Sequence, residues 1–203
     1  MSFYNFAKGL LNIVFKGFYK IKYVGTENIP ESPFLLCSNH VSYCDPILVA
    51  LPIKQEMHFM AKYELFKIPL LNVIIKKLGA FPVKRGHANV ESIDTAISLL
   101  KEGNSLVIFP EGTRSKSGKP QKPKSGAALV AHRADIQILP VAIKMQNRKL
   151  FRSLVTITYG KPIAPQELNI DHQTSNALKD ASQIIMGRIL DMFYDNDVQG
   201  KEE

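Results

Sequence analysis

The sequence predicts an α/β fold in which helices cover a mixed, largely parallel central sheet. Short apolar runs bounded by glycine, proline and polar residues alternate with longer stretches of helical periodicity, and this alternation is typical of α/β folds. The 203 residues are enough for one domain with a sizeable core. We expect strands over residues 34–38, 58–61, 80–83, 106–109, 138–143 and 154–159. We expect helices over residues 46–51, 62–77, 89–101, 125–133 and 176–194.

The N-terminal segment, residues 1–22, has the pattern of an amphipathic helix. It is mostly apolar and aromatic, and it contains no uncharged apolar run near the roughly 20 residues needed to span a bilayer. A basic stripe recurs every four residues: Lys8, Asn12, Lys16 and Lys20. Because every charge is positive, we expect this helix to lie in a membrane interface, ahead of a single α/β domain over residues 23–203. A helix docked on the protein's own core has a similar pattern and is the alternative.

The formal net charge of +8 indicates anionic partners. Two cysteines and the absence of a signal peptide favour the cytoplasmic side. We therefore expect a peripheral, monotopic protein that binds an anionic lipid surface on the cytoplasmic face of the cell membrane. Nucleic acid is a poor partner, because the aromatic residues lie in apolar runs rather than among the basic residues. The sequence assigns no oligomeric state.

The segment Asn39–Pro46 offers a candidate general base. His40 is followed five residues later by Asp45 and then by Pro46. A spacing of five places two side chains on different faces of a regular helix, but proline favours the first helical position and disfavours helix before it. We therefore expect Asp45 to cap a helix that begins at Pro46, with His40 in the preceding loop and one ring nitrogen within reach of Asp45. A polar loop histidine beside an ordinary helix cap is the alternative.

The apolar segment over residues 65–78 leaves two interpretations open. Pro69 breaks or restarts its helix, and a lysine pair ends it. It is either a buried crossover helix or a second contact with the membrane beside residues 1–22.

Two further segments place charged side chains after predicted strands. In residues 105–115, Pro110 and Gly112 force a turn, so Glu111 and Arg114 follow a strand end, where open α/β sheets place their sites. The planar guanidinium of Arg114 suits a phosphate group. In residues 79–86, Lys84 and Arg85 likewise follow an apolar run and suit an anionic ligand. Solvated loop ends with surface ion pairs are the alternative for both segments.

Together these segments resemble the glycerolipid acyltransferase family, and within it the 1-acyl-glycerol-3-phosphate acyltransferases. That family has four sequence blocks in order: Asn-His-(four residues)-Asp, apolar-Pro-Val-x-Arg, Phe-Pro-Glu-Gly-Thr-Arg and a later apolar-Pro-Val. All four occur here in that order between Asn39 and Val141, which is half of the chain. The similarity extends through the residues from Tyr159 to Ile163.

The resemblance implies an activity and a set of site residues. The chain would move a fatty acyl group from a thioester donor, acyl carrier protein or coenzyme A, to the sn-2 hydroxyl of lysophosphatidic acid, giving phosphatidic acid. His40 would be the general base and Asp45 its orienting partner. The remaining implied residues would bind substrate: Lys62, Lys84, Arg85, Glu111, Gly112, Thr113 and Arg114. Lys84 stands where the family often has an acidic residue, which makes Arg85 the stronger candidate for the phosphate.

This chemistry requires neither an enzyme nucleophile nor a cofactor. The acceptor supplies its own hydroxyl, the thioester is already activated, and the five histidines and two cysteines show no metal-ligand spacing. We expect His40 to take the proton of the hydroxyl while Asp45 fixes the imidazole tautomer. Cys44 opens a rival route through an acyl-enzyme, which would become the better interpretation if Cys44→Ala abolished turnover in a folded protein.

A basic loop directly follows the block that ends at Arg114. Its lysines are Lys116, Lys119, Lys122 and Lys124. We expect this loop to receive the acidic donor, either the phosphates of coenzyme A or an acyl carrier protein, unless it is simply solvated. Other functions stay open: transfer to another lysolipid or to a hydroxy or amine lipid, thioester hydrolysis, and a non-enzymatic membrane-surface adaptor.

Overall fold

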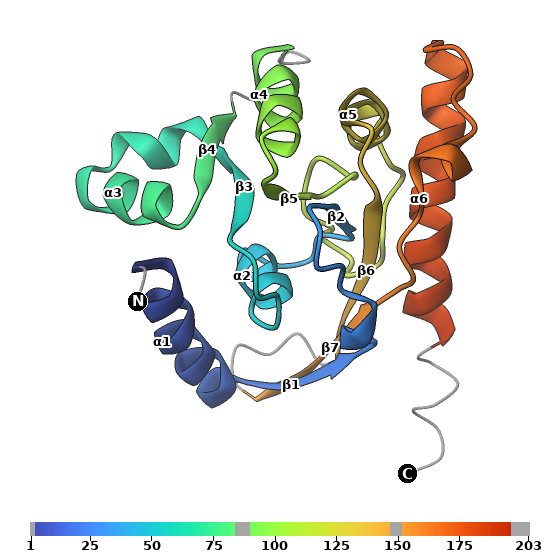
Figure 1. The fold of residues 1–203 in the computed structure, drawn as a ribbon. Helices are drawn as coiled ribbons and strands as arrows, with labels where there is room; N and C mark the ends of the chain where they lie inside the picture. Colours follow the sequence, from blue (N-terminus) through green and yellow to red (C-terminus); the bar gives the residue numbers. More distant parts are fainter. Residues whose placement is uncertain (1–2, 84–89, 147–151, 196–203) are drawn as a thin grey trace.

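The computed structural model describes residues 3–83, 90–146 and 152–195. Its centre is a seven-stranded sheet with the order β1-β7-β6-β2-β5-β3-β4 (Figure 1). The strands are β1 (Tyr19–Val24), β2 (Leu35–Ser38), β3 (Met57–Lys62), β4 (Ala80–Val83), β5 (Ser105–Ile108), β6 (Ile138–Met145) and β7 (Ser153–Tyr159). Among these described strands, β6 and β7 are the one antiparallel pair. The predicted mixed, largely parallel sheet is confirmed.

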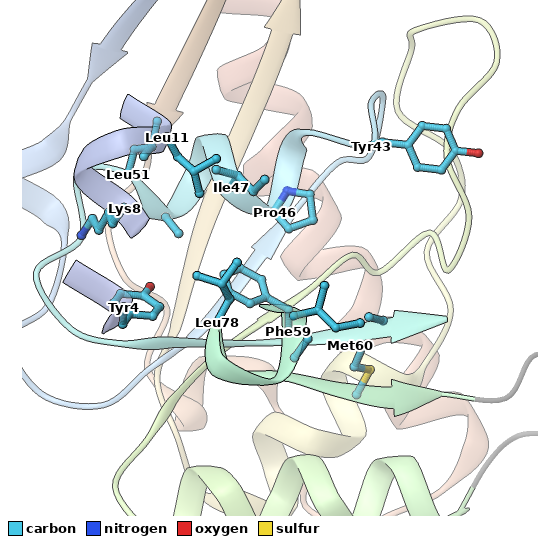
Figure 2. Close-up of a pocket in the computed structure, with 14 residues that line it drawn as sticks. Tyr4, Lys8, Leu11, Tyr43, Pro46, Ile47, Leu51, Phe59, Met60 and Leu78 are labelled. Carbon is cyan, nitrogen blue, oxygen red and sulfur yellow. The ribbon is translucent and has the colours of Figure 1, made fainter. Parts of the chain in front are cut away.

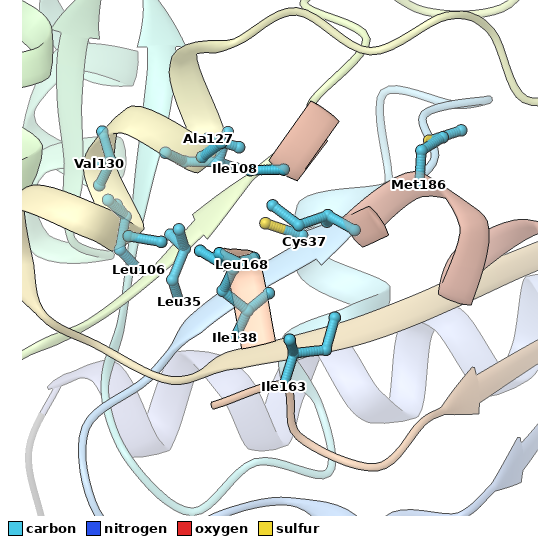
Figure 3. Close-up of a cluster of buried hydrophobic side chains, with 14 of the residues drawn as sticks. Leu35, Cys37, Leu106, Ile108, Ala127, Val130, Ile138, Ile163, Leu168 and Met186 are labelled. Carbon is cyan, nitrogen blue, oxygen red and sulfur yellow. The ribbon is translucent and has the colours of Figure 1, made fainter. Parts of the chain in front are cut away.

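Helices cover both faces of the sheet. They are α1 (Phe3–Phe18), α2 (Asp45–Ala50), α3 (Pro69–Lys77), α4 (Val90–Lys101), α5 (Gly126–Ala134) and α6 (Ser175–Asp195), with short 3₁₀ turns η1 (Thr26–Asn28), η2 (Tyr63–Lys67) and η3 (Pro165–Leu168). One buried cluster joins the sheet to α4, α5 and α6, and part of it is drawn in Figure 3. The other joins the sheet to α1 and α2. Along β2, Leu35 and Cys37 face the first cluster and Leu36 faces the second, as strand geometry requires.

The strand order creates a topological switch point between β2 and β5. These strands are neighbours, but the chain leaves β2 through α2 toward β3, whereas it leaves β5 through α5 toward β6. The two connections therefore depart in opposite directions over opposite faces. Such a point opens a crevice at the carboxyl ends of the strands, where α/β sheets bind ligands.

The N-terminal helix is shorter than the predicted range of residues 1–22. It ends at Phe18, and Tyr19–Val24 form β1, paired in parallel with β7. Within β1, apolar residues that face the core alternate with exposed Lys20 and Lys22, which is the period of a strand. The alternation of a strand therefore determines the structure here, and the four-residue spacing of the lysines does not. Lys20 lies in β1 and is not part of a helical stripe.

Four other predicted helices also differ at their ends, α5 and α6 by a single residue at each end. The helix expected over residues 62–77 is divided into η2 and α3, because Pro69 at the first turn of α3 starts a new helix. Helix α2 begins at Asp45, one residue before the predicted start at Pro46.

One side of α1 docks on the protein and the opposite side is exposed. The Tyr4 hydroxyl accepts a hydrogen bond from the Met57 N–H at 3.1 Å, and the Lys8 ammonium donates to the Ile53 carbonyl. Lys8 therefore points toward the protein and does not belong to a solvated stripe on α1. Apolar side chains are exposed on the rest of the helix: Phe3, Phe6, Leu10, Ile13, Val14 and Phe18. In the described ranges, no helix is both long and apolar enough to cross a bilayer.

Candidate active site

The site is centred on His40 and Asp45, just beyond the carboxyl end of β2. The His40 Nδ1 lies 2.8 Å from Asp45 Oδ2, so the expected contact between the two side chains is present. The same oxygen accepts the N–H groups of Val41 at 2.6 Å and Ser42 at 2.7 Å. The Asp45 carboxylate is completely buried and makes no capping bond to α2. The prediction that it caps this helix is therefore wrong, because it accepts its hydrogen bonds from the loop that precedes the helix.

The imidazole of His40 is fixed on two sides. Its ring stacks on Phe109, with centroids 4.0 Å apart and planes 18° from parallel. Because Asp45 accepts a hydrogen bond at Nδ1, the neutral ring carries its proton there and leaves Nε2 as the free acceptor. The side chain remains 17% exposed, so a substrate can reach it. Among the described residues, the second oxygen of Asp45, Oδ1, is buried and has no hydrogen-bond partner.

The turn after β5 holds the backbone of His40 from both sides. The Glu111 carboxylate oxygen Oε1 accepts the His40 N–H at 2.9 Å, and the Ser115 N–H donates to the His40 carbonyl at 2.7 Å. Glu111 is 2% exposed. Burial raises the pKa of its carboxyl group, while hydrogen bonds from the His40 backbone and from Gln121 act in the opposite direction. The carboxylate of Glu111 is thus engaged with the loop of the general base.

Asn39 attaches the same loop to β6. Its side-chain amide donates to the Ile143 carbonyl at 2.8 Å and accepts the Ile143 N–H at 2.7 Å. Asn39 is fully buried. Sequence reasoning used this residue only as part of a block and missed its role in fixing the loop.

A pocket of about 210 Å³ lies beside His40. The carboxyl ends of β3, β4 and β5 and the following turn form its walls, and it brings His40 together with the predicted residues Lys62, Gly112 and Thr113. Lys62 lies 3.6 Å from Glu64 in an exposed ion pair. The residues that line the pocket are His40, Phe59, Met60, Ala61, Lys62, Val83, Val107, Ile108, Phe109, Gly112 and Thr113.

The remaining predicted cations lie differently. The Arg114 guanidinium does not line this pocket and instead stacks over the Tyr43 ring, 3.3 Å from its centroid. Tyr43 is 79% exposed, so the stacked pair lies at the surface. Lys84 and Arg85 fall outside the described residues, directly after the pocket-lining Val83.

A second pocket, of about 220 Å³, is almost entirely apolar. It lies between α1, α2, β3 and the C-terminal part of α3, and it shares Phe59, Met60 and Ala61 with the pocket beside His40. In Figure 2, Tyr4 and Lys8 lie at the end of this pocket opposite Tyr43. Burial lowers the pKa of Lys8 and raises that of Tyr4. The structure thus places an apolar space next to a candidate general base.

Comparison with known proteins assigns the family. The sequence profile of the Acyltransferase family matches residues 20–144, which include the His40 loop, the turn after β5 and the pocket beside His40. The chain belongs to this acyltransferase family. The match covers more than half of the chain and contains both His40 and Asp45. The resemblance inferred from the sequence blocks is therefore confirmed.

Individual relatives of this acyltransferase come from plants and bacteria. The chain is 36% identical over 147 residues to the chloroplastic 1-acyl-sn-glycerol-3-phosphate acyltransferase LPAT1 of Arabidopsis thaliana, covering 70% of this chain and 41% of that protein. It is 32% identical over 165 residues to the 1-acyl-sn-glycerol-3-phosphate acyltransferase of Bacillus subtilis, covering 79% and 82% of the two chains. The chain thus spans less than half of the plant relative.

A solved structure shares the fold. The crystal structure of the 1-acyl-sn-glycerophosphate (LPA) acyltransferase PlsC from Thermotoga maritima superposes with a TM-score of 0.68 at 25% identity. The superposition covers 87% of this chain and 72% of that chain. The overall architecture of this acyltransferase therefore agrees with that of a solved member of the family.

Proposed function

We propose that this chain transfers a fatty acyl group from a thioester donor to the sn-2 hydroxyl of 1-acyl-glycerol-3-phosphate, forming phosphatidic acid. The observation on which the proposal rests is the imidazole of His40 bonded to the buried carboxylate of Asp45 at the switch point of the sheet. The Arabidopsis and Bacillus relatives are both named 1-acyl-sn-glycerol-3-phosphate acyltransferases, which supports the same acceptor.

In the proposed reaction, His40 acts as general base. Its Nε2 takes the proton of the acceptor hydroxyl as the hydroxyl oxygen attacks the thioester carbonyl. The ester C–O bond forms, the C–S bond breaks, and the imidazolium returns its proton to the leaving thiolate. Asp45 holds the ring in the Nδ1–H tautomer and stabilises the imidazolium, as the carboxylate of a catalytic triad does. Direct transfer leaves Cys44 without a covalent role.

The two pockets suit the two parts of the acceptor. The pocket beside His40 would hold the glycerol portion, with Gly112 and Thr113 in its wall. Lys62, Arg114 and the Lys84–Arg85 pair would neutralise the phosphate, since guanidinium and ammonium groups bind phosphate oxygens well. The apolar pocket that shares Phe59, Met60 and Ala61 would accept a fatty acyl chain. Glu111 would support the acceptor site indirectly, by holding the His40 loop.

The thioester donor would approach over the basic loop. Replacing Lys116, Lys119, Lys122 and Lys124 with glutamine should raise the donor KM and weaken its dependence on salt, since the donor carries phosphate or carboxylate groups. Comparing acyl-coenzyme A with acyl carrier protein in this variant would identify the donor that depends on the loop.

We further propose that the protein is peripheral on the cytoplasmic face of the membrane. Exposed apolar side chains continue from α1 onto α3, which contributes Leu70, Val73 and Ile74. The Lys77 ammonium lies 5.0 Å from the centroid of the Phe3 ring, so the two helices meet at one place. Neighbouring apolar faces with lysines among them are suited to an anionic lipid interface.

The decisive experiment measures transfer of a labelled acyl group to lysophosphatidic acid in vesicles. Wild type should form phosphatidic acid with at least one of the two donors. His40→Ala should reduce kcat by about 10²- to 10⁴-fold, the usual contribution of a general base. Asp45→Asn should reduce it within about the same range, because the neutral amide no longer stabilises the imidazolium.

His172→Ala is the matched control, because His172 is exposed and distant in sequence from the site. It should retain the wild-type rate. Hydrolysis of the donor without acceptor would favour a thioesterase. Absence of any transfer by folded, vesicle-bound wild type would overturn the proposed reaction and direct the assay to other lysolipids.

A further inference from the structure

The loop over residues 116–124 folds back onto the active-site turn. The Lys124 N–H donates to the Pro110 carbonyl at 2.8 Å, which closes the loop at its far end. The Lys124 side chain lies against Gly112, since a Cβ on that glycine would come within 3.1 Å of the lysine Nζ. At the near end, the hydroxyls of Ser115 and Ser117 lie 3.2 Å apart. Residues 116–124 are therefore packed against the active-site turn. They bring a side chain from outside the family blocks close to the loop that carries His40.

That side chain is Gln121. Its amide Nε2 donates to the Glu111 oxygen Oε2 at 2.9 Å, while the other oxygen of Glu111 accepts the His40 N–H at 2.9 Å. A weaker contact of 3.5 Å joins the same amide to the Thr113 carbonyl. A hydrogen-bonded chain thus runs from Gln121 through the buried carboxylate of Glu111 to the backbone of His40.

We propose that Gln121 is a positioning residue for acyl transfer, which holds the Glu111 carboxylate in its hydrogen bond to the His40 N–H. The proposal builds on the function proposed above, since it assigns His40 the role of base. A buried carboxylate with donors at both oxygens is satisfied, whereas removal of the Gln121 side-chain amide leaves Glu111 with only the backbone bonds from His40 and Gln121. The carboxylate then takes up a proton more readily, and its hold on the backbone of His40 weakens.

The neighbouring charges determine the direction of the effect. Burial raises the pKa of Glu111, and the donated bonds from His40 and Gln121 lower it. The His40 imidazole also lowers this pKa, Asp45 contacts the same imidazole, and the Lys124 ammonium lies beside Gly112. Arg114 is directed to the Tyr43 ring. Loss of the Gln121 donor therefore moves the pKa of Glu111 further upward.

The test compares Gln121→Met with wild type. Methionine keeps the length of the side chain but donates no hydrogen bond. The acidic limb of the pH profile of kcat should move to higher pH, because loss of a hydrogen bond to the charged carboxylate favours its protonated form. On the alkaline plateau of both profiles, kcat should return to within about threefold of wild type. Gln166→Met, an exposed glutamine at the opposite edge of the sheet, is the matched control and should leave the profile unchanged.

A second readout does not depend on activity. The carboxyl carbon of Glu111, labelled with ¹³C, should titrate at higher pH in Gln121→Met than in wild type. The amide proton of His40 should exchange faster in the variant at pH 6. An equal loss of kcat at every pH, together with an unmoved Glu111 titration, would overturn the proposal. If wild type lacked acyl transfer altogether, the proposed function would fail, while the titration and exchange would still decide whether Gln121 controls Glu111.

Discussion

The geometry of His40 is determined by hydrogen bonds within its own loop and by contacts with the distant turn after β5 and strand β6. Asp45 holds the ring, Glu111 holds the backbone N–H, and Asn39 joins the loop to β6. Each contact is made by a side chain with little or no exposure, so these hydrogen bonds do not compete with solvent. A base held in this way loses little conformational entropy when the substrate binds.

At the residue scale, the stacked pair of Tyr43 and Arg114 leads to a prediction about the acceptor. The Arg114 guanidinium lies 3.3 Å from the centroid of the Tyr43 ring, and Arg114 is one of the residues proposed to bind the acceptor phosphate. Such stacking contributes about 0.5–2 kcal/mol, so Tyr43→Ala should raise the KM for lysophosphatidic acid about 2- to 30-fold with little change in kcat. Tyr43→Phe keeps the ring and should retain the wild-type KM. Equal KM values for all three proteins would exclude a role for the stacking.

Glu111 leads to a second prediction, about stability. Because burial raises the pKa of Glu111 above its ordinary value of 4.5, the folded protein retains a proton that the unfolded chain releases between the two pKa values. The free energy of unfolding contributed by this group therefore falls as the pH rises through that window. Glu111→Gln does not titrate, so its stability relative to wild type should increase from about pH 4.5 and level off above the raised pKa.

Urea unfolding of wild type and Glu111→Gln between pH 4 and 8 measures this difference. Glu102→Gln, at an exposed site beyond α4, should show no such trend. A constant difference between wild type and Glu111→Gln across the range would mean that Glu111 ionises alike in the folded and unfolded states.

At the scale of elements, most of the fold followed from local patterns. The six expected strands all occur, because each is a short apolar run between turn residues. Strand β1 was missed because Lys16 and Lys20 continued a helical spacing, and its partner β7 lies more than 130 residues away. Long-range pairing of this kind is not encoded in a local window.

In the candidate site, too, local contacts were predicted from the sequence and long-range contacts were not. The contact between His40 and Asp45 was predicted, because a helix that starts near Pro46 leaves His40 in the preceding loop within reach of Asp45. The contacts of Asn39 with Ile143 and of Gln121 with Glu111 were not, because they join segments whose meeting depends on the finished sheet. Arg114 was expected at a phosphate site, and only the structure reveals its stacking on Tyr43.

Helices α1 and α3 lead to a prediction about membrane binding. Ile13 is 73% exposed and Leu70 is 75% exposed, so neither contributes to the core. The double variant Ile13→Asp/Leu70→Asp should keep its thermal stability but bind vesicles at least 10-fold more weakly. Burial of these two apolar side chains in the lipid would contribute on the order of 3 kcal/mol to the free energy of vesicle binding. Tyr194→Asp, at an exposed aromatic residue on α6, is the control and should bind as wild type does. Unchanged binding of the double variant in a sedimentation assay would contradict a role for these two faces.

At the scale of the whole molecule, the apolar pocket lies beside the same helices whose outer faces are exposed. Helices α1 and α3 both contribute to its wall, and the pocket shares three β3 residues with the space beside His40. An acyl chain leaving a bilayer under these helices would therefore have a short path to the base. This arrangement requires that the molecule bind with one particular side toward the lipid.

Charge provides a test of that orientation, since the formal net charge is +8 but only some lysines lie near the exposed apolar faces. Lys67, Lys76 and Lys77 belong to η2 and α3. Replacing these three with glutamine should weaken binding to vesicles that contain anionic lipid by about 10-fold or more, since each lysine at a charged surface contributes about 1 kcal/mol.

Raising the salt concentration from 50 to 500 mM should weaken wild-type binding to the same vesicles, but not to zwitterionic ones. The matched variant replaces Lys101 on α4, Lys161 after β7 and Lys179 on α6, which are all exposed, and it should bind nearly as wild type does. Equal losses in the two triple variants would mean that the total charge, rather than one oriented side of the protein, determines binding.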